Sequence, residues 1–456
     1  MPELDLAVRG GTVVTASETR LADVGIAGGR ISALGEVGEA RAELDASGLF
    51  VLPGVVDAHT HLDAQALPGA PRTADDFESG TIAAACGGVT TVVDYARQHP
   101  GRSLAEAAQD WCARAEGKAV IDYGFHLVAT DFSDASLADV PSVVADGFPS
   151  FKAFMMRLSD AELLRLMSAV AAAGGLVMAH AENAWALEHR KQELFAQGRR
   201  SARWYVDSRP EIGEAEATSR AFDYADLIGA KVCVVHLSCD AALERVRAAK
   251  ARSAQAWAEV RPCYLLLDSE RYTAPGAEPL MFSGCPPLRA AWNLDRLWAG
   301  LADGTLDVIG SDHCAWTLEQ KSVGAEDFSL IPHGIPALET ELVSLWTAGV
   351  GGGKLSANRL VEAMATAPAR LHGLYPRKGT IAVGSDADLV LFDPNRDETI
   401  TQSRLHSRTG YEPCEGMRCV GWPVLTLSRG DVIARDGEYV GKPGRGQLLR
   451  RERPPR

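Results

Sequence analysis

The sequence lacks the features that mark membrane proteins and disulfide-rich secreted proteins. No uninterrupted apolar run approaches the roughly 20 residues that a membrane-spanning helix needs, so we expect no membrane partner. The nine cysteines are odd in number and never show Cys-x-x-Cys spacing, and the first residues show no basic region followed by an apolar stretch. We therefore expect no secretory signal, and reduced thiols in the cytoplasm.

Positive charge is also scarce. Lys and Arg number 46 against 60 Asp and Glu, which gives a net charge of −14. This balance argues against nucleic acid as a partner, because phosphate binding needs clustered cations. The one basic cluster is 445–456, which we expect to be a solvated and frayed terminus. The remaining composition, with 46% hydrophobic residues, is that of a globular protein with a large core.

The middle of the chain alternates apolar strands with alanine-rich helical stretches. Helices are expected at 104–115, 160–173, 214–228 and 241–252. The predicted strands are 55–61, 90–94, 123–128, 150–154, 176–180, 231–237, 256–260 and 307–311. Eight strands with intervening helices predict an α/β fold, a (β/α)8 TIM barrel.

Both ends of the chain consist of short strands separated by turn residues. Strands are predicted at 6–8, 12–14, 24–26 and 30–34, and again at 387–392, 424–427 and 432–434. We expect these segments to meet as a small β-sandwich domain beside the barrel. The predicted division is 1–54 and 376–456 for the β-sandwich, with the barrel at 55–375.

Titratable residues end several of the predicted barrel strands, where the active site of such a barrel lies. His59 and His61 close the first strand and, being two residues apart, point to the same side of it. Such a pair suits a divalent ion. Two polar residues on a half-exposed strand would give the same pattern and are the alternative. His180, His236 and Asp312 end the fifth, sixth and eighth strands. Five such residues at one rim predict a metal site.

Lys152 lies inside the fourth strand between apolar neighbours. A buried, unpaired ammonium group is costly and tends to lose its proton. The neutral amine can take up carbon dioxide and become a carbamate, whose two oxygens bridge two metal ions. A lysine that extends to the rim of the barrel is the alternative. Together with the histidines and Asp312, the carbamate is the favoured interpretation.

The chain resembles the hydantoinase and dihydropyrimidinase branch of the amidohydrolase superfamily over nearly its whole length. Each motif is weak alone, but many of them follow one another in the order found in the family, which makes the resemblance specific. These motifs are Gly54–Asp63, Ala74–Thr81, Gly87–Asp94, Phe151–Lys152, His180–Asn183, Arg209–Glu211, Glu216–Arg220, Val235–Ser238, Pro286–Arg289, Ser311–Cys314 and Glu415–Met417.

The resemblance implies two metal ions, usually zinc, bridged by the carbamate on Lys152. It implies His59, His61 and Asp312 at the first ion, with His180 and His236 at the second. Manganese, nickel or iron can use similar ligands. Relatives of this kind are commonly homotetramers, with a dimer as the alternative.

Such a site indicates how a cyclic amide, imide or ureide is opened. Two divalent ions lower the pKa of a shared water, and the resulting metal-bridging hydroxide attacks a ring carbonyl. Asp312 can accept the proton and pass it to the departing ring nitrogen.

Three positions depart from the family pattern. Arg157 stands where a tyrosine usually donates to the developing oxyanion, His333 stands where an asparagine pairs with the ring amide, and Cys285 replaces a serine. Arg157 either replaces the tyrosine, clamps a substrate carboxylate, or points to solvent. His333 either hydrogen-bonds the substrate amide or titrates near neutral pH. Arg157, Cys285 and His333 are therefore the predicted substrate-binding residues, with Asp312 and Arg157 as catalytic residues.

Three functions are compatible with these residues. The favoured one is a hydrolase of hydantoin-like or dihydropyrimidine-like rings. The second is a related hydrolase whose ring is allantoin-like, carboxylate-bearing or a lactam, or a deaminase. The third is a non-catalytic scaffold like the collapsin-response proteins, which is disfavoured because all six ligand positions hold competent residues.

Overall fold

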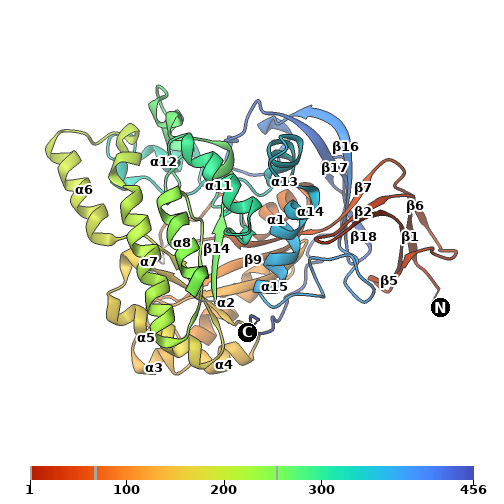
Figure 1. Cartoon of the computed structure of the whole chain (residues 1–456), viewed down its shortest axis with the longest axis horizontal. Coiled ribbons are helices and arrows are strands. Elements are labelled where there is room, and N and C mark those ends of the chain that lie inside the picture. The colour runs from red at the N-terminus through yellow and green to blue at the C-terminus, as the bar shows by residue number, and fades with distance from the viewer. Residues whose placement is uncertain (1–2, 66–68, 253–254, 456) are drawn as a thin grey trace.

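The chain forms a barrel with a two-sheet β-domain beside it (Figure 1). The computed structural model describes residues 3–65, 69–252 and 255–455. In Figure 1 the barrel and its helices lie to the left of the β-domain, and the C-terminus lies beneath the barrel.

Eight parallel strands form the barrel in their order along the chain. They are β8 (Val55–Thr60), β9 (Val89–Arg97), β10 (Asp122–Val128), β11 (Ser150–Phe154), β12 (Leu176–His180), β13 (Lys231–Val234), β14 (Ala256–Val260) and β15 (Val308–Ile309). The first and last strands meet just beyond β15, where the His61 amide donates to the His313 carbonyl at 2.8 Å. The predicted barrel is confirmed.

Helices surround the strands and cover their outer faces. They are α1 (Phe77–Cys86), α2 (Leu104–Ala115), α3 (Asp134–Leu137), α4 (Val140–Ala145), α5 (Asp160–Ala172), α6 (Ala184–Ala196), α7 (Glu211–Ile228), α8 (Asp240–Arg252), α9 (Pro262–Leu266), α10 (Glu278–Met281), α11 (Trp292–Ala302), α12 (Leu318–Ser322), α13 (Glu341–Leu345), α14 (Ala357–Val361) and α15 (Ala367–Leu371). Capping boxes fix the first residues of several helices, such as Ser103 with Glu106 at α2. The outward strand residues Val92, Phe125 and Val177 pack with these helices in the main core.

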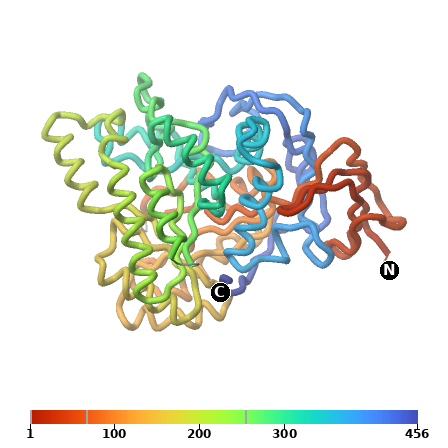
Figure 2. Tube along the Cα trace, in the orientation of Figure 1, coloured from red at the N-terminus to blue at the C-terminus, as the bar shows by residue number. Residues whose placement is uncertain are grey.

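The β-domain takes strands from both ends of the chain, as predicted. One sheet has the order β5 (Arg30–Gly35), β4 (Asp23–Ala27), β1 (Leu6–Arg9) and β6 (Glu43–Asp45). The other has the order β19 (Glu438–Tyr439), β18 (Asp431–Arg435), β17 (Arg418–Ser428), β16 (Leu389–Thr399), β7 (Phe50–Pro53), β2 (Thr12–Val14) and β3 (Thr19–Leu21). Figure 2 shows the N-terminal and C-terminal segments side by side here. The boundaries at residues 54 and 375 stay predictions.

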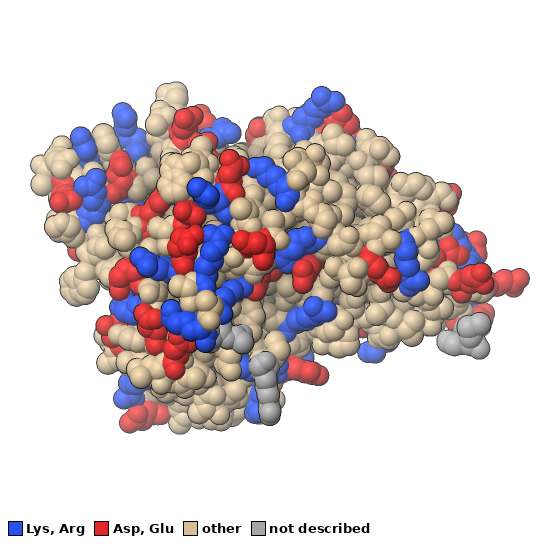
Figure 3. Space-filling model, viewed as in Figure 1, with Lys and Arg blue, Asp and Glu red and all other residues tan. Residues whose placement is uncertain are grey.

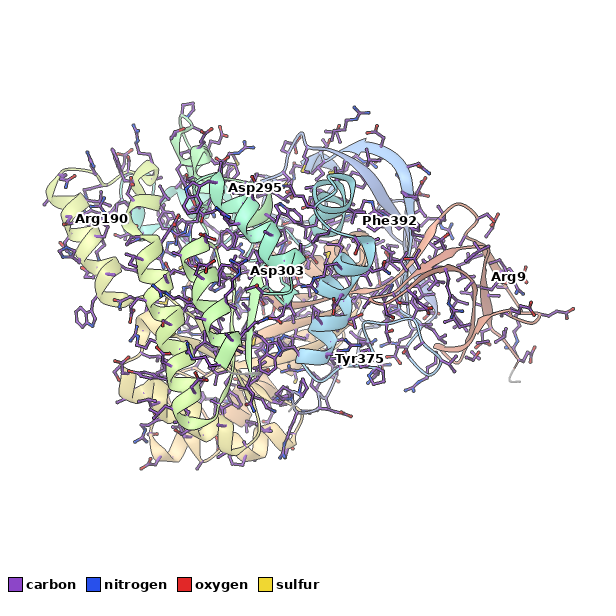
Figure 4. The ribbon with its side chains drawn as sticks, in the orientation of Figure 1. Arg9, Arg190, Asp295, Asp303, Tyr375 and Phe392 are labelled. Atoms are coloured by element: carbon purple, nitrogen blue, oxygen red, sulfur yellow. The ribbon has the colours of Figure 1, made fainter. Side chains whose placement is uncertain are left out.

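A ring contact joins the β-domain to the barrel. Phe392 of β16, labelled in Figure 4, packs with its ring centroid 4.6 Å from that of Trp346. Trp346 begins the π-helical turn Trp346–Gly351, which continues α13. The two parts of the chain therefore share an apolar junction.

The surface carries mixed charge. On the face in Figure 3, cationic and anionic side chains alternate over the barrel helices. None of the helices in the described residues combines the length and the apolar character needed to cross a bilayer.

Two of the predicted barrel strands end at least two residues early. β13 ends at Val234 and β15 at Ile309, before the predicted ends at 237 and 311. His236 and Asp312 have φ angles of 41° and 48°, which an extended strand cannot accommodate. The chain therefore leaves each strand just before the residue that faces the mouth of the barrel.

The prediction of a frayed basic terminus is wrong for 445–455, the part of the cluster that the structure describes; residue 456 lies outside the described residues. Leu449 is 1% exposed and Arg451 4%. The Leu449 amide donates to the Tyr123 carbonyl at 2.7 Å, and Arg451 donates to the Ser150 hydroxyl at 2.7 Å. The segment lies under the barrel because its backbone extends the pairing of β10 and its arginine meets buried acceptors.

Candidate active site

The six predicted metal ligands lie together at the carboxyl ends of the barrel strands. His59, Lys152 and His180 belong to β8, β11 and β12, and His61 follows β8 directly. His236 and Asp312 lie two and three residues beyond the ends of β13 and β15. Parallel strands bring these side chains to one rim of the barrel.

One half of this group surrounds Asp312. Its Oδ1 lies 2.9 Å from His61 Nε2 and 3.2 Å from His59 Nε2. Lys152 Nζ lies 3.2 Å from the same His59 nitrogen. His59, His236 and Asp312 each offer a ligand atom within 4.8 Å of the others. This separation suits donors that share an ion.

His180 and His236 form the other half. Their ring centroids are 4.4 Å apart. The buried Nδ1 of His236 has no hydrogen-bond partner among the described residues. His180 Nε2 donates to Glu182 at 2.7 Å, which leaves its Nδ1 as the nitrogen available to an ion. The unpartnered nitrogen of His236 and the orientation of His180 by Glu182 are both features of metal sites.

Three buried residues that sequence reasoning did not identify support this group. Glu259 accepts a hydrogen bond from His59 Nδ1 at 2.6 Å and another from the His236 amide at 3.0 Å. Arg261 NH1 lies 3.2 Å from the second carboxylate oxygen of Asp312. The ring of Tyr95 lies under Lys152, with Nζ 4.7 Å from its centroid. A charged residue inside an apolar strand, the signal that singled out Lys152, also marks Glu259.

Burial and neighbouring charges set the protonation of these groups. Burial lowers the pKa of Lys152 to about 8 and that of His61 to about 4. Burial alone raises the pKa of Asp312, but the charges of Arg261 and His59 hold it well below its usual value. The neutral imidazole and ionised carboxylate that result are the protonation states of metal ligands.

Two of the three predicted substrate residues lie around a cavity of about 640 Å³, a volume typical of small-molecule sites. Arg157 and His333 both line it. Arg157 is exposed in the short helical turn Met155–Arg157, and its guanidinium lies 5.6 Å from the Phe154 ring centroid.

His333 and Cys285 are fixed more firmly. His333 stacks on Tyr205 with ring centroids 5.1 Å apart, and its buried Nε2 has no partner among the described residues. Burial lowers the pKa of His333 to about 3, so its imidazole is neutral and the near-neutral titration considered above is disfavoured. Cys285 Sγ lies 3.2 Å from Glu182 and 2.6 Å from Arg209.

An eight-stranded parallel barrel with these side chains at its mouth has the architecture of a metal-dependent hydrolase. The model of the amidohydrolase family matches residues 50–433. The chain is 40% identical to the D-hydantoinase of Geobacillus stearothermophilus over 451 residues, which cover 97% of this chain and 96% of that one. It is 39% identical to the D-hydantoinase of Ralstonia pickettii, with 99% of each chain covered.

Solved structures agree. The crystal structure of dihydropyrimidinase from Brevibacillus agri matches with a TM-score of 0.96 at 40% identity and covers 99% of each chain. This chain belongs to the amidohydrolase family, within its hydantoinase and dihydropyrimidinase branch. The family predicted from the motifs is confirmed.

Proposed function

We propose that this protein is a metal-dependent hydrolase that opens the ring of a cyclic amide, imide or ureide of the hydantoin or dihydropyrimidine kind. The observation that carries the proposal is the meeting of His59, Lys152 and Asp312 at the mouth of the barrel. The predicted enzyme class agrees with the relatives named D-hydantoinase and D-phenylhydantoinase.

The candidate ligands fit a pair of divalent ions. We assign one ion to His59, His61 and Asp312 and the other to His180 and His236, with zinc as the expected metal. The free Nδ1 of His236 and the Glu259 carboxylate behind His59 support this assignment. When bound, such a pair supplies an activated water and polarises the substrate carbonyl.

Lys152 is the proposed site of carboxylation. Its side chain is 1% exposed, and burial lowers its pKa to about 8. The neutral amine that this favours adds carbon dioxide and releases a proton, which gives an N-carboxylate with two oxygens. The carbamate is an anion, whereas protonated Lys152 is a buried cation, and the two proposed metal ions can balance the negative charge of the carbamate.

Asp312 is the proposed proton carrier. Arg261 lies against its Oδ2, while its Oδ1 faces His59 and His61. Because its pKa lies well below the usual value, the carboxylate is ionised and can accept the proton of the attacking water. Delivering that proton to the ring nitrogen lets the C–N bond break, which leaves an amine from a cyclic amide, an amide from an imide and a ureido group from a ureide.

The substrate contacts stay proposals. His333 is suited to hydrogen-bond a ring amide, because its buried Nε2 faces no protein partner. The Cys285 thiol donates a hydrogen bond to Glu182 at the same rim of the barrel. Arg157 lines the cavity either as an oxyanion donor or as a clamp for a substrate anion. A ring that is allantoin-like, carboxylate-bearing or a lactam is therefore the second candidate substrate class.

The assembly and location are also proposals. The resemblance supports a homotetramer, with a dimer as the alternative. All nine cysteines are free thiols, which supports the reducing cytoplasm as the location.

Ring opening by enzyme supplied with zinc and bicarbonate tests the function. The panel is dihydrouracil, 5-substituted hydantoins and allantoin, followed by chromatography of the opened acids. We expect turnover of at least one ring, loss of turnover after chelation, and recovery when metal is restored. Intact rings throughout, with metal bound, would refute the proposal.

A further inference from the structure

Two arginines at the mouth of the barrel have no carboxylate partner within the described part of the chain. We propose that Arg97 and Arg157 form an anion-binding subsite for a carboxylate on the substrate ring. The inference rests on the proposed ring-opening function and narrows its substrate to a cyclic ureide with an acidic substituent.

Arg97 faces the lumen beside the candidate metal centre. It is the last residue of β9, two positions after Tyr95, whose ring lies against Lys152. Residues two apart on a strand point to the same side, so Arg97 follows Tyr95 into the barrel, one step nearer the mouth. Val128 of β10 pairs with Arg97 on one side and with Lys152 on the other. Arg97 therefore lies at the level of Lys152.

Arg157 approaches the same place from β11. It lines the cavity of about 640 Å³ together with His333. The Arg157 guanidinium lies 5.6 Å from the Phe154 ring centroid, and Lys152 Nζ lies 5.4 Å from the same centroid. Arg157 therefore lies beside Lys152, the residue with which Arg97 is level. The pKa of Arg97, lowered by burial and then by the charge of Arg157, agrees with this placement.

Neighbouring arginines are paired with acids, whereas these two are not. Arg72 and Arg114 lie 2.5 Å and 3.6 Å from carboxylate oxygens of Asp63. Arg102 lies 3.3 Å from Glu106.

In the described residues neither Arg97 nor Arg157 has a side-chain hydrogen bond or an ion pair. Arg97 is also partly buried, so its charge is less well solvated than that of a surface arginine. Two adjacent guanidinium groups without an acid match the planar, bidentate geometry of a carboxylate. Because the subsite adjoins the reaction centre, the anion it fits best is a substituent of the ring itself.

The test compares hydantoin-5-acetate with its uncharged analogue hydantoin-5-acetamide, using zinc-loaded wild-type enzyme. The two substrates have the same ring and differ only in the charge of the substituent. We expect kcat/KM to favour the acetate by about 10- to 100-fold, the usual effect of a charge-assisted hydrogen bond. Arg97→Gln and Arg157→Gln should each reduce this ratio about tenfold, through KM for the acetate rather than kcat.

Arg102→Gln is the matched control, since it removes an arginine that lies five residues after Arg97 and is already paired with Glu106. It should leave the ratio unchanged. A wild-type ratio near one, or a loss in Arg102→Gln equal to that in Arg97→Gln, would overturn the subsite. An equal fall in kcat on both substrates in Arg157→Gln would also overturn it, because Arg157 would then act at the reacting carbonyl.

The outcomes separate the two proposals. Opening of uncharged rings without preference for the acetate leaves the proposed function intact and overturns the subsite alone. Failure to open any ring, charged or uncharged, overturns both.

Discussion

Replacing Glu259 with glutamine tests how strongly the residues behind the candidate ligands control metal binding. Glu259 is 1% exposed and holds two ligands at once, through the His59 ring and the His236 backbone. Glutamine keeps the shape but removes the charge that favours the Nδ1–H form of His59. That form leaves Nε2 free for the ion.

The geometry sets the size of the effect. The 2.6 Å contact between His59 and Glu259 is a buried, charge-assisted hydrogen bond. Such a bond contributes about 1.5–3 kcal/mol. Since about 1.4 kcal/mol is a factor of ten in an equilibrium constant, we expect roughly 10- to 100-fold weaker metal binding.

Competition with a chromophoric chelator measures this affinity, and elemental analysis after dialysis measures the metal retained. Glu341→Gln is the control. Burial, with a smaller contribution from Asp57, raises the pKa of Glu341 well above its usual value, so glutamine there replaces an already uncharged group. Equal metal affinity in Glu259→Gln and wild type would refute a role for Glu259 in orienting His59.

Three further changes have definite outcomes. Lys152→Ala should lose most bound metal and activity, and retention of both by elemental analysis and assay would exclude the bridging carbamate. Cys285→Ser should keep the rate within a few-fold, because a serine hydroxyl can keep the contacts with Glu182 and Arg209; a fall in kcat/KM well beyond tenfold would show that the thiol itself is needed. Burial raises the pKa of Asp75, but hydrogen bonds from His313 and Ser407 lower it from 3.8 to about 2. Because this pKa is depressed, the ionised carboxylate stabilises the fold above pH 4, and that stabilisation is lost as the pH falls toward 2. The free energy of unfolding of Asp75→Asn should therefore be about 2 kcal/mol below that of wild type at pH 5, with a smaller difference at pH 3, as the difference in Tm reports. A constant difference would contradict this.

The barrel could be predicted from the sequence because its strands are buried on both faces. The apolar run 176–179 marks such a strand clearly, and 150–154 does so apart from Ser150 and Lys152; the predicted ranges 150–154 and 176–180 agree with β11 and β12. The short strands β3 and β6 expose most of their residues and carry no such signal. They form because neighbouring strands offer them hydrogen bonds, which a local pattern does not contain.

The candidate site likewise contains residues that can be predicted from the sequence and residues that cannot. A histidine or aspartate after an apolar strand predicts a group at the mouth, and the six ligand-type residues meet there. Arg261 is harder to identify, because its role rests on one contact with Asp312, which the pairing of the consecutive strands β14 and β15 brings within 3.2 Å. The sequence around residue 261 does not record which side chain this arginine contacts.

The segment under the barrel has a consequence for biosynthesis. Gly446 to Glu452 bond to backbone groups between Ala119 and Gly147 and at Gly373, so the floor of the barrel contains residues translated more than 300 positions after β10. A nascent chain can assemble its strands earlier, but these donors and acceptors of β10 stay exposed to water until the ribosome has released residue 451. The emerging chain therefore presents that edge of β10 unpaired, and premature termination shortly before residue 446 leaves the floor of the barrel without these hydrogen bonds.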